Sequence, residues 1–232
     1  MHSAARIPDI ANIVFINILS NVKLALIPLW SLYMHSKTFD IFFKFFNQLG
    51  IEDEVINKVA SELKFMVLEP SQVLLYQGEP QKYGYLIVSG VLRACYFSNG
   101  GNERCKEYYF QGEMTFLYSA WLTNTPANYQ IDTLNKSEVI RIPLAILNSS
   151  NWQSAKLNLL QQQLLYKEEK EVFLLLKNPE ERYIHMVKHA PKWLNSLNDI
   201  QLSAYIGISP ISLSRIKNRI KKHHFNDVIN LS

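Results

Sequence analysis

The sequence is poor in cysteine and lacks the short motifs that mark enzyme active sites. Two cysteines among 232 residues are too few for a disulfide framework, which indicates a reducing compartment, and too few for the four thiolates of an ordinary iron–sulfur cluster. The six histidines show no metal-ligand spacing with cysteines or carboxylates. A nucleophile elbow, a phosphate-binding loop and a dinucleotide glycine fingerprint are all missing. We therefore expect a cytoplasmic protein that is not an enzyme and that holds no metal and no cofactor.

The composition is that of a globular protein with a mild positive charge. Hydrophobic residues make up 48% and charged residues 19% of the chain, which is long enough for one large or two small domains. The net charge of +4 permits a nucleic-acid partner without requiring one. The local distribution of charge is therefore more informative than the total.

Glycine is scarce, and it is concentrated in one part of the chain. Six of the eight glycines fall between Gly78 and Gly112, where they separate short runs rich in β-branched and aromatic residues. Many short strands with evenly spaced turns are typical of a small barrel or jelly roll. A β domain with a purely structural role is the simplest alternative. The expected strands are Tyr85–Val88, Val91–Phe97, Glu103–Phe110, Ile131–Thr133 and Ser137–Ile142.

The two cysteines flank one of these turns. Cys95 and Cys105 lie symmetrically about Gly100, so one hairpin register places them opposite each other and a shift by one residue separates them. A redox switch is one interpretation. Two reduced thiols is the interpretation that a cytoplasmic protein favours.

A long helix is predicted from Ser154 to Lys177, where Leu157, Leu160 and Leu164 recur at helical spacing. Such a helix either packs on its own domain or pairs with a second copy, and we favour pairing. The dipeptide Asn178-Pro179 ends it. A further helix is expected over Pro179–Leu194, with Tyr183, Met186 and Val187 facing inward, and Pro191 ends that pattern.

The segment Asp199–Asn218 has the pattern of two short helices joined by a tight turn. Gly207 suits a turn that needs a positive φ, Ser209 can cap the second helix, and Pro210 falls in its first turn. This pattern is typical of a helix-turn-helix, whose second helix enters the major groove of DNA. A solvated amphipathic helix is the plain alternative.

The second helix is expected to bury one face and to present a polar, basic one. Leu213, Ile216 and Ile220 share the inward face, and no acidic residue occurs between Asp199 and Asp227. Arg215 is the first candidate for a base contact, because arginine pairs bidentately with guanine. The predicted DNA-binding residues are Ser209, Ile211, Ser212, Ser214, Arg215, Lys217, Asn218, Arg219 and Lys222.

The order of barrel, long helix and helix-turn-helix resembles the Crp/Fnr transcription regulators. The resemblance covers about residues 38–222 and is carried by YGYLIVSGVLRACYFSNGGNE, NPEERYIHMVK and AYIGISPISLSRIKN; the last two are most similar to the branch common in Bacteroidetes. It implies an α+β fold with a cyclic-nucleotide-binding-like β-barrel or jelly roll, a dimerisation helix, and a C-terminal helix-turn-helix, which in this chain has little or no wing. It also implies a homodimer that binds promoter or operator DNA, with RNA polymerase as a further candidate partner.

The ligand site of that family does not carry over intact. Nucleotide-binding members use a Gly-Glu pair and, later, an Arg-Ser pair to hold the ribose and the cyclic phosphate. Aligned from Gln111-Gly112, this chain has Phe116-Leu117 and Ala127-Asn128 there, so the carboxylate and the guanidinium are missing. The effector is thus unknown and cyclic AMP is disfavoured. The pocket is either empty, filled by Phe116, Tyr118 and Trp121, or adapted to an apolar or aromatic ligand. Its predicted residues are Phe116, Leu117, Tyr118, Ala127 and Asn128.

Both ends of the chain depart from the family pattern. Residues 10–33 are strongly apolar, but Lys23 and Pro28 interrupt the roughly 20 apolar residues that a membrane span needs. We interpret residues 1–33 as an upstream extension outside the native protein, with a membrane-associating helix as the second interpretation. At the other end, Phe225–Ser232 is too short for a full β-hairpin wing. We therefore expect the phosphate contacts to come from the basic residues on the flanks of the second helix, Lys217, Arg219 and Lys221.

These patterns predict an organisation in four parts. After the extension at 1–33 come a barrel at 34–150, a dimerisation helix at 151–178 and a helix-turn-helix domain at 179–232. The function predicted is that of a dimeric, sequence-specific transcription regulator. The alternative is a ligand-binding β-barrel protein whose helical tail makes protein contacts.

Overall fold

The computed structural model describes residues 36–98 and 100–229, with the side chains of those ranges except 36, 37, 39 and 222–229. The predicted apolar extension at 1–33 lies outside the described residues. Within the described part, no helix is long and apolar enough to cross a membrane.

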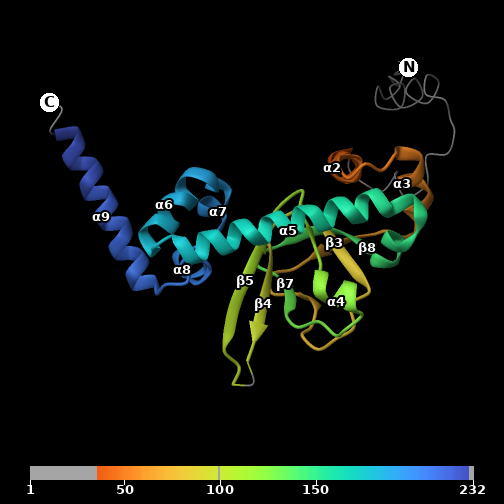
Figure 1. Ribbon diagram of the computed structural model, residues 1–232, viewed down its shortest axis with the longest axis horizontal. Helices are drawn as coiled ribbons and strands as arrows, with labels where there is room; N and C mark the ends of the chain where they lie inside the picture. Colours follow the sequence, from red (N-terminus) through yellow and green to blue (C-terminus); the bar gives the residue numbers. More distant parts are fainter. Residues whose placement is uncertain (1–35, 99, 230–232) are drawn as a thin grey trace, which may run out of the picture.

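The chain runs from short helices through a set of strands into a helical C-terminal half (Figure 1). The strands are β1 (Lys64–Leu68), β2 (Val73–Leu75), β3 (Tyr83–Ser89), β4 (Leu92–Phe97), β5 (Glu103–Tyr109), β6 (Met114–Thr115), β7 (Gln130–Thr133) and β8 (Ser137–Pro143). The α-helices are α2 (Ser36–Gln48), α3 (Asp53–Val59), α4 (Tyr118–Thr123), α5 (Gln153–Leu176), α6 (Pro179–His189), α7 (Pro191–Ser196), α8 (Asp199–Ile206) and α9 (Pro210–Ile229). Short 3-10 turns lie at Ala60–Glu62, Leu144–Asn148 and Ser150–Trp152.

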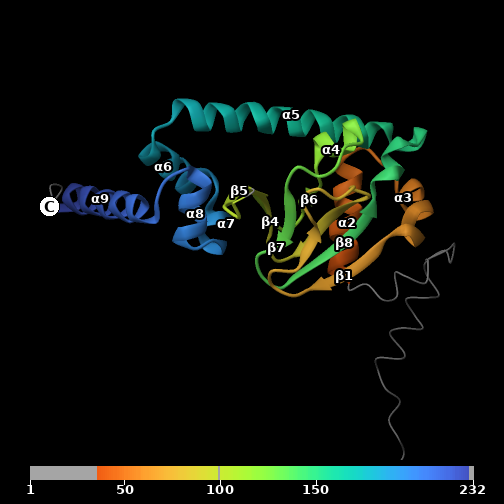
Figure 2. The same cartoon turned by 90° about the horizontal axis from the view of Figure 1, so that it is seen from below.

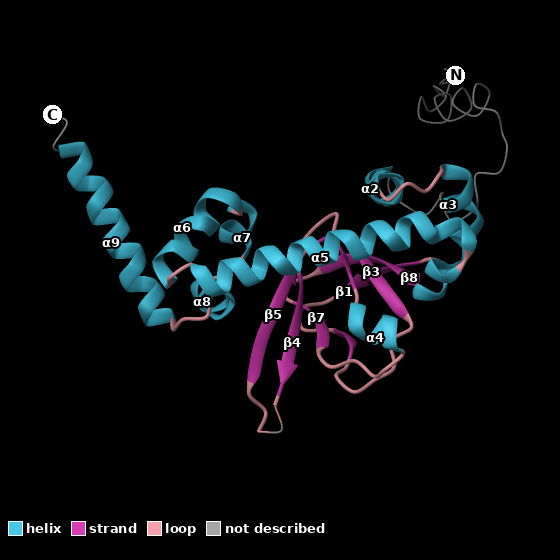
Figure 3. Cartoon of the chain, in the orientation of Figure 1, coloured by secondary structure: helices cyan, strands magenta, loops and turns pink. Residues whose placement is uncertain are grey.

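The strands form two antiparallel sheets, which we call the barrel (Figure 3). One sheet has the order β1-β8-β3-β6 and the other β2-β7-β4-β5, so β5 is an edge strand. The predicted strands are confirmed with small shifts of their ends, whereas β1, β2 and β6 were not anticipated. The mixed α+β fold with a jelly-roll-like barrel is thus the predicted one.

Strand alternation divides the barrel core into two layers. Ile87 and Val139 point between the two sheets, where they meet Leu92, Ala94 and Ile131 of the second sheet. Side chains of opposite parity on the first sheet pack instead against the helices. This outer layer includes Phe42, Phe46, Leu86, Val88, Ile140, Ile142, Trp152, Ala155 and Leu159.

The long helix α5 extends from the barrel to the C-terminal unit, as we call helices α6–α9 (Figure 2). It matches the predicted helix within one residue at each end. Asn178 then starts α6 with a capping box, because its side chain accepts hydrogen bonds from the N–H groups of Glu180 and Glu181.

Two predictions for the following segment were wrong. The helix expected over Pro179–Leu194 is two helices, because Ala190 leaves the helical conformation and Pro191, which lacks an N–H, begins α7. Val187 does not face inward: it is 45% exposed, whereas Met186 is buried. Tyr183 and Met186 do pack inward as predicted, so Val187 alone of the three lies off the inward face of α6.

Candidate functional site

The turn between α8 and α9 is built from local hydrogen bonds. Gly207 adopts φ 79°, a left-handed conformation that glycine tolerates best. The N–H of Ile208 donates to the carbonyl of Ser203 at 3.0 Å. The hydroxyl of Ser209 accepts from the N–H of Ser212 at 3.1 Å, so Ser209 caps α9 as predicted. The turn therefore fixes the angle at which α9 leaves α8.

The inner faces of α8 and α9 pack into one apolar cluster. Leu202 and Ile206 of α8 meet Leu213 of α9, and Phe173 of α5 and Met186 of α6 complete the cluster. Because these residues come from four helices, α9 is anchored by its N-terminal turns. Figure 1 shows that its remaining turns extend away from the other helices.

The opposite face of α9 is exposed over the residues predicted to contact DNA. Ser214, Arg215 and Asn218 are exposed, Ser212 is half-buried, and the side chain of Ile211 is 66% exposed. Among the described side chains, Arg215 has no ion-pair or hydrogen-bond partner. Its guanidinium, with five donors, is therefore available to a partner outside this chain.

The basic residues on the flanks of α9 are partly occupied. Lys217 forms an ion pair with Asp199, and Arg219 pairs with Glu180 at 2.5 Å. Both were predicted to reach phosphates, and each would have to exchange its carboxylate for a phosphate to do so. The side chain of Lys222, another predicted contact, lies outside the described residues, although the α9 backbone continues to Ile229.

Arg182 on α6 holds the C-terminal unit to the end of α5. Its guanidinium donates to three backbone carbonyls: that of Leu174 at 2.6 Å, of Lys177 at 2.9 Å and of Ile206 at 2.8 Å. The last of these is the C-terminal residue of α8, directly before the turn glycine. Arg182 thereby connects α5, α6 and α8 at one point.

A buried polar cluster joins the barrel to the helices. The carboxylate of Glu107 on β5 accepts hydrogen bonds from Lys170 at 2.8 Å and from the hydroxyl of Tyr166, both on α5. Lys170 also donates to the carbonyl of Lys106 at 2.6 Å. The hydroxyl of Tyr205 on α8 lies 3.3 Å from that of Tyr166. Burial, first, and the neighbouring Glu107 carboxylate raise the pKa of Tyr166, which keeps its proton for this contact.

An aromatic contact lies beside this polar cluster. The ring of Trp193 on α7 lies 5.2 Å from Phe110 and 5.9 Å from Tyr108, measured between ring centroids. Lys192 forms an ion pair with Glu113 at 2.6 Å at the edge of the same contact. Through these residues, α7 and α8 rest directly on the edge of the barrel at β5.

Sequence reasoning missed the residues of this junction. Glu107 could not be distinguished from the other charged residues of an edge strand. A signal existed on α5, where Tyr166, Lys170 and Phe173 follow at spacings of four and three and therefore share one helix face. That face is opposite the exposed leucines, so the pattern could have identified it as the side toward the barrel.

Most of the residues predicted to form the effector pocket belong to the packed core. Phe116, Leu117 and Ala127 are buried in the apolar core, and Asn128 is exposed. Tyr118 packs against Phe116, with ring centroids 4.2 Å apart. Tyr118 also lines the cavity between the barrel and α5, whose wall includes none of the other four predicted residues.

The backbone of Leu117 is satisfied from within the chain. Its N–H donates to the side-chain carbonyl of Gln81 at 2.6 Å, and its carbonyl accepts from the side-chain amide of Gln81 at 3.0 Å. A glutamine side chain therefore bonds to the backbone at the position that the sequence resemblance aligned with the Gly-Glu pair. The neighbouring apolar side chains leave no charged group for a phosphate.

A cavity of about 410 Å³ lies between the barrel and α5. Its wall includes Lys106 and Tyr109 of β5, Tyr118, and Gln163 and Tyr166 of α5. Burial, and the nearby ammonium of Lys167, lower the pKa of Lys106 to about 7. The cavity thus combines aromatic walls with amide and amine groups.

The barrel matches a known domain family. Residues 65–149 match the family described as "Cyclic nucleotide-binding domain". A comparison with curated proteins finds no relative that matches the sequence.

Most of the chain shares its fold with Crp/Fnr-type regulators. It superposes on FixK2 of Bradyrhizobium japonicum with a TM-score of 0.61 at 14% identity, covering 70% of this chain and 86% of that one. The c-di-GMP-responsive global regulator CLP of Xanthomonas campestris gives 0.55 at 12% identity, with 75% and 93% covered. A putative cAMP-binding regulatory protein of Silicibacter pomeroyi gives 0.55 at 16%, with 81% and 89% covered. At these identities the likeness establishes the fold. Membership of a Bacteroidetes-type branch stays a prediction.

Proposed function

We propose that the chain is a sequence-specific DNA-binding transcription regulator, in which α9 enters the major groove as the second helix of a helix-turn-helix. The observation that carries this proposal is the free Arg215 on the exposed, polar face of a helix whose other face is anchored. The capped turn at Ser209 supports it, because it presents the first turn of α9 with its side chains outward. The fold shared with known regulators points the same way.

A mobility-shift titration against the DNA upstream of the chain's own gene tests this function. Arg215→Ala should weaken specific binding by about 1–3 kcal/mol per half-site, because one bidentate base contact has roughly that value. Arg104→Ala removes an exposed arginine on β5, far from α9 in the sequence, and is the matched control. Equal affinity of the Arg215→Ala variant and the wild type for the specific site would refute the assignment.

A second variant separates base contacts from phosphate contacts. Lys221 is exposed on α9, and its removal should weaken binding to every DNA sequence to a similar degree. Lys221→Ala should also reduce the slope of log affinity against log salt concentration by about 1. Arg215→Ala, in contrast, should lower the preference for the specific site over random DNA. The rival ligand-binding barrel with a protein-contacting tail predicts no salt-dependent DNA binding at all.

We propose further that the active form is a homodimer paired through α5. This helix turns its buried residues to the barrel and leaves an apolar stripe exposed: Leu157, Leu164, Leu165, Val172, Leu175 and Leu176. At 100° per residue, the stripe covers an arc of about 120°. Leu157 and Leu164, like Leu165 and Val172, are seven residues apart, the repeat that two paired helices share. A second copy of the same stripe is the partner that this pattern fits.

Light scattering on the purified protein tests the pairing. Leu164→Glu places a charge in the stripe at a residue that is 62% exposed, so it should yield a monomer without unfolding the chain. Leu122→Glu on α4, at a residue that is 55% exposed, is the matched control and should leave the mass unchanged. A wild-type protein that is monomeric at micromolar concentration would contradict the proposal.

For the effector domain, we propose that cyclic AMP is not the ligand. The support is the apolar packing of Phe116, Leu117 and Ala127 and the use of the Leu117 backbone by Gln81. A buried cyclic phosphate needs a cationic partner, and these positions supply none. A thermal-shift titration with cyclic AMP should leave the melting temperature unchanged, and a saturable rise would contradict this part of the proposal.

A further inference from the structure

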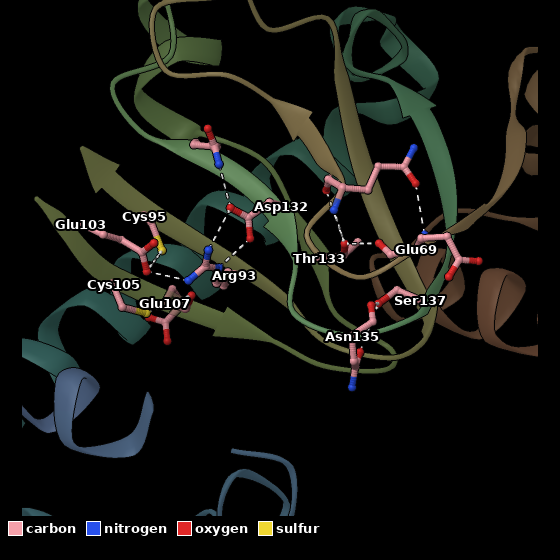
Figure 4. A network of polar contacts seen from close by, with 12 residues as sticks. Glu69, Arg93, Cys95, Glu103, Cys105, Glu107, Asp132, Thr133, Asn135 and Ser137 are labelled. Carbon is pink, nitrogen blue, oxygen red and sulfur yellow. Dashed lines mark hydrogen bonds and ion pairs between the residues drawn. The ribbon is translucent and has the colours of Figure 1, made fainter. Parts of the chain in front are cut away.

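Cys95 and Cys105 are direct partners across β4 and β5. The strand register pairs them, with an irregularity between Ala94 and Cys95. Figure 4 shows both side chains on these neighbouring strands, with Arg93 and Glu103 nearby. Directly opposed residues of antiparallel strands have Cα atoms about 4.5–5.5 Å apart, within the range of about 4.4–6.8 Å that a disulfide spans. The chain contains no other cysteine, so an internal disulfide has only one possible pairing.

The two thiols differ in their surroundings. Cys95 is fully buried, and its sulfur lies 3.6 Å from a carboxylate oxygen of Glu103. Hydrogen bonding to Cys105 and burial raise the pKa of Cys95. The same hydrogen bond lowers the pKa of Cys105, with further help from Tyr108 and Lys170, although burial opposes it. Cys105 is only partly buried. It is therefore the thiol with more thiolate character and better access.

Cys105 also lies at the contact between the barrel and the C-terminal unit. It packs against a cluster of buried residues that contains Tyr108, Phe110 and Leu197, and Trp193 and Tyr205 pack against the same cluster. A chemical change at this sulfur would therefore alter the surface of the barrel on which α7 and α8 pack. The two residues after Cys105 carry the polar contacts to Lys170.

We propose that Cys95 and Cys105 form a reversible redox pair that reacts with a hydroperoxide and, as a disulfide, loosens the contact between β5 and α7. The thiolate of Cys105 attacks the outer oxygen of the hydroperoxide. The O–O bond breaks, an alcohol or water leaves with a proton, and Cys105 becomes a sulfenic acid. The sulfur of Cys95 then attacks that of Cys105, the S–O bond breaks, and water leaves with the thiol proton. In total, two thiols lose two electrons to the peroxide, and a dithiol reductant reverses the change.

The disulfide changes the junction because it moves one sulfur. Bonding to Cys95 draws the Cys105 sulfur toward β4 and toward the Arg93–Glu103 ion pair. Trp193 and Tyr205 pack against the same cluster as Cys105, so this movement disturbs their packing. Close-packed contacts lose much of their dispersion energy when a gap opens, so α7 should separate more readily from the barrel.

The test uses the full-length, reduced protein, treated with hydrogen peroxide and analysed by intact and peptide mass spectrometry. We expect the wild type to lose two hydrogen atoms, to form a 95–105 cross-link within one chain, and to recover with dithiothreitol. Cys95→Ala should stop at a sulfenic acid on Cys105, which dimedone traps, whereas Cys105→Ser should remain unreacted under the same treatment. Two thiols that oxidise independently, or a disulfide between two chains, would overturn the pairing.

Hydrogen exchange of residues 191–206 tests the effect on the junction. Oxidised wild-type protein should exchange faster there than reduced protein, and Cys105→Ser should show no change on treatment. A disulfide that leaves this exchange unaltered would overturn the proposed loosening. Neither measurement uses DNA, so the outcome is independent of whether the chain binds it.

Discussion

The ion pair between Glu107 and Lys170 offers a quantitative test of the junction between the barrel and α5. Their side chains are 4% and 14% exposed, and their charged atoms lie 2.8 Å apart. Removing one partner of a buried pair costs about 3–5 kcal/mol, because the other charge is left without compensation. Glu107 would still accept from Tyr166 and from the N–H of Tyr108, so we expect Lys170→Met to lower the free energy of unfolding by about 3 kcal/mol.

The double variant Glu107→Gln/Lys170→Met separates this explanation from a simple loss of packing. When both charges are replaced by neutral groups of similar shape, the desolvation penalty disappears with the attraction. The double variant should therefore regain at least half of the stability that Lys170→Met loses. Lys167→Met, three residues earlier and exposed, is the control for methionine on this helix.

Urea denaturation followed by far-UV circular dichroism measures these differences, with the thermal midpoint as a second measure. A loss of about 3 kcal/mol corresponds to a fall of about 6–12 °C for a chain of this length. A double variant that is no more stable than Lys170→Met would refute the reasoning. So would a Lys170→Met variant that behaves like Lys167→Met.

Three further predictions concern single residues. Leu213→Ala should lower the free energy of unfolding by about 2–5 kcal/mol, because Leu213 is fully buried, whereas the exposed Ile211→Ala should lower it little. Equal effects of the two variants in urea denaturation would contradict the assignment of the two faces of α9. Arg182→Lys should cost about 2 kcal/mol or more, since lysine cannot donate to three carbonyls in the same geometry, and faster hydrogen exchange in α8 would locate the loss. Burial lowers the pKa of Lys106 to about 7 from an ordinary 10.5, so between these pH values the unfolded chain binds a proton that the folded chain does not. The free energy of unfolding of the wild type should therefore rise with pH across that window, relative to that of Lys106→Met. Parallel pH profiles of the two proteins would exclude this effect.

Local chemistry explains why the turn between α8 and α9 could be predicted from the sequence. Gly207, Ser209 and Pro210 each act on their immediate neighbours, and the burial of Leu213 and Ile216 follows from helical period alone. The long helix was equally accessible, because Asn178-Pro179 marks its end. The strand register at Cys95 was not, since an irregularity of one residue decides which side chains face each other.

The junction at β5 was beyond the sequence for a different reason. Glu107 and Lys170 are 63 residues apart in the sequence, and no local pattern predicts a contact between residues so far apart. The absence of a charged pair at Phe116-Leu117 and Ala127-Asn128 could be read directly from the sequence. The hydrogen bonds of Gln81 to the Leu117 backbone could not, because that side chain comes from a loop 36 residues earlier. The division of α6 from α7 shows a third limit, since a proline can end one helix and begin the next within two residues.

The two attachments of the C-terminal unit differ in a way that bears on control of α9. Arg182 bonds to backbone carbonyls of α5 and α8, which no change in the barrel removes. The contact of Trp193 with β5 depends instead on side chains of the barrel, and it lies beside Cys105 and beside the cavity wall. If oxidation of Cys95 and Cys105 loosens the second attachment, as we propose, the first should persist. The C-terminal unit would then pivot at the end of α5 rather than detach, and in a dimer paired through α5 such a pivot changes the spacing of the two α9 helices. In the DNA-binding dimer that we propose, half-site spacing decides whether both helices reach DNA together, so the β5–α7 contact would be the place where the barrel controls binding.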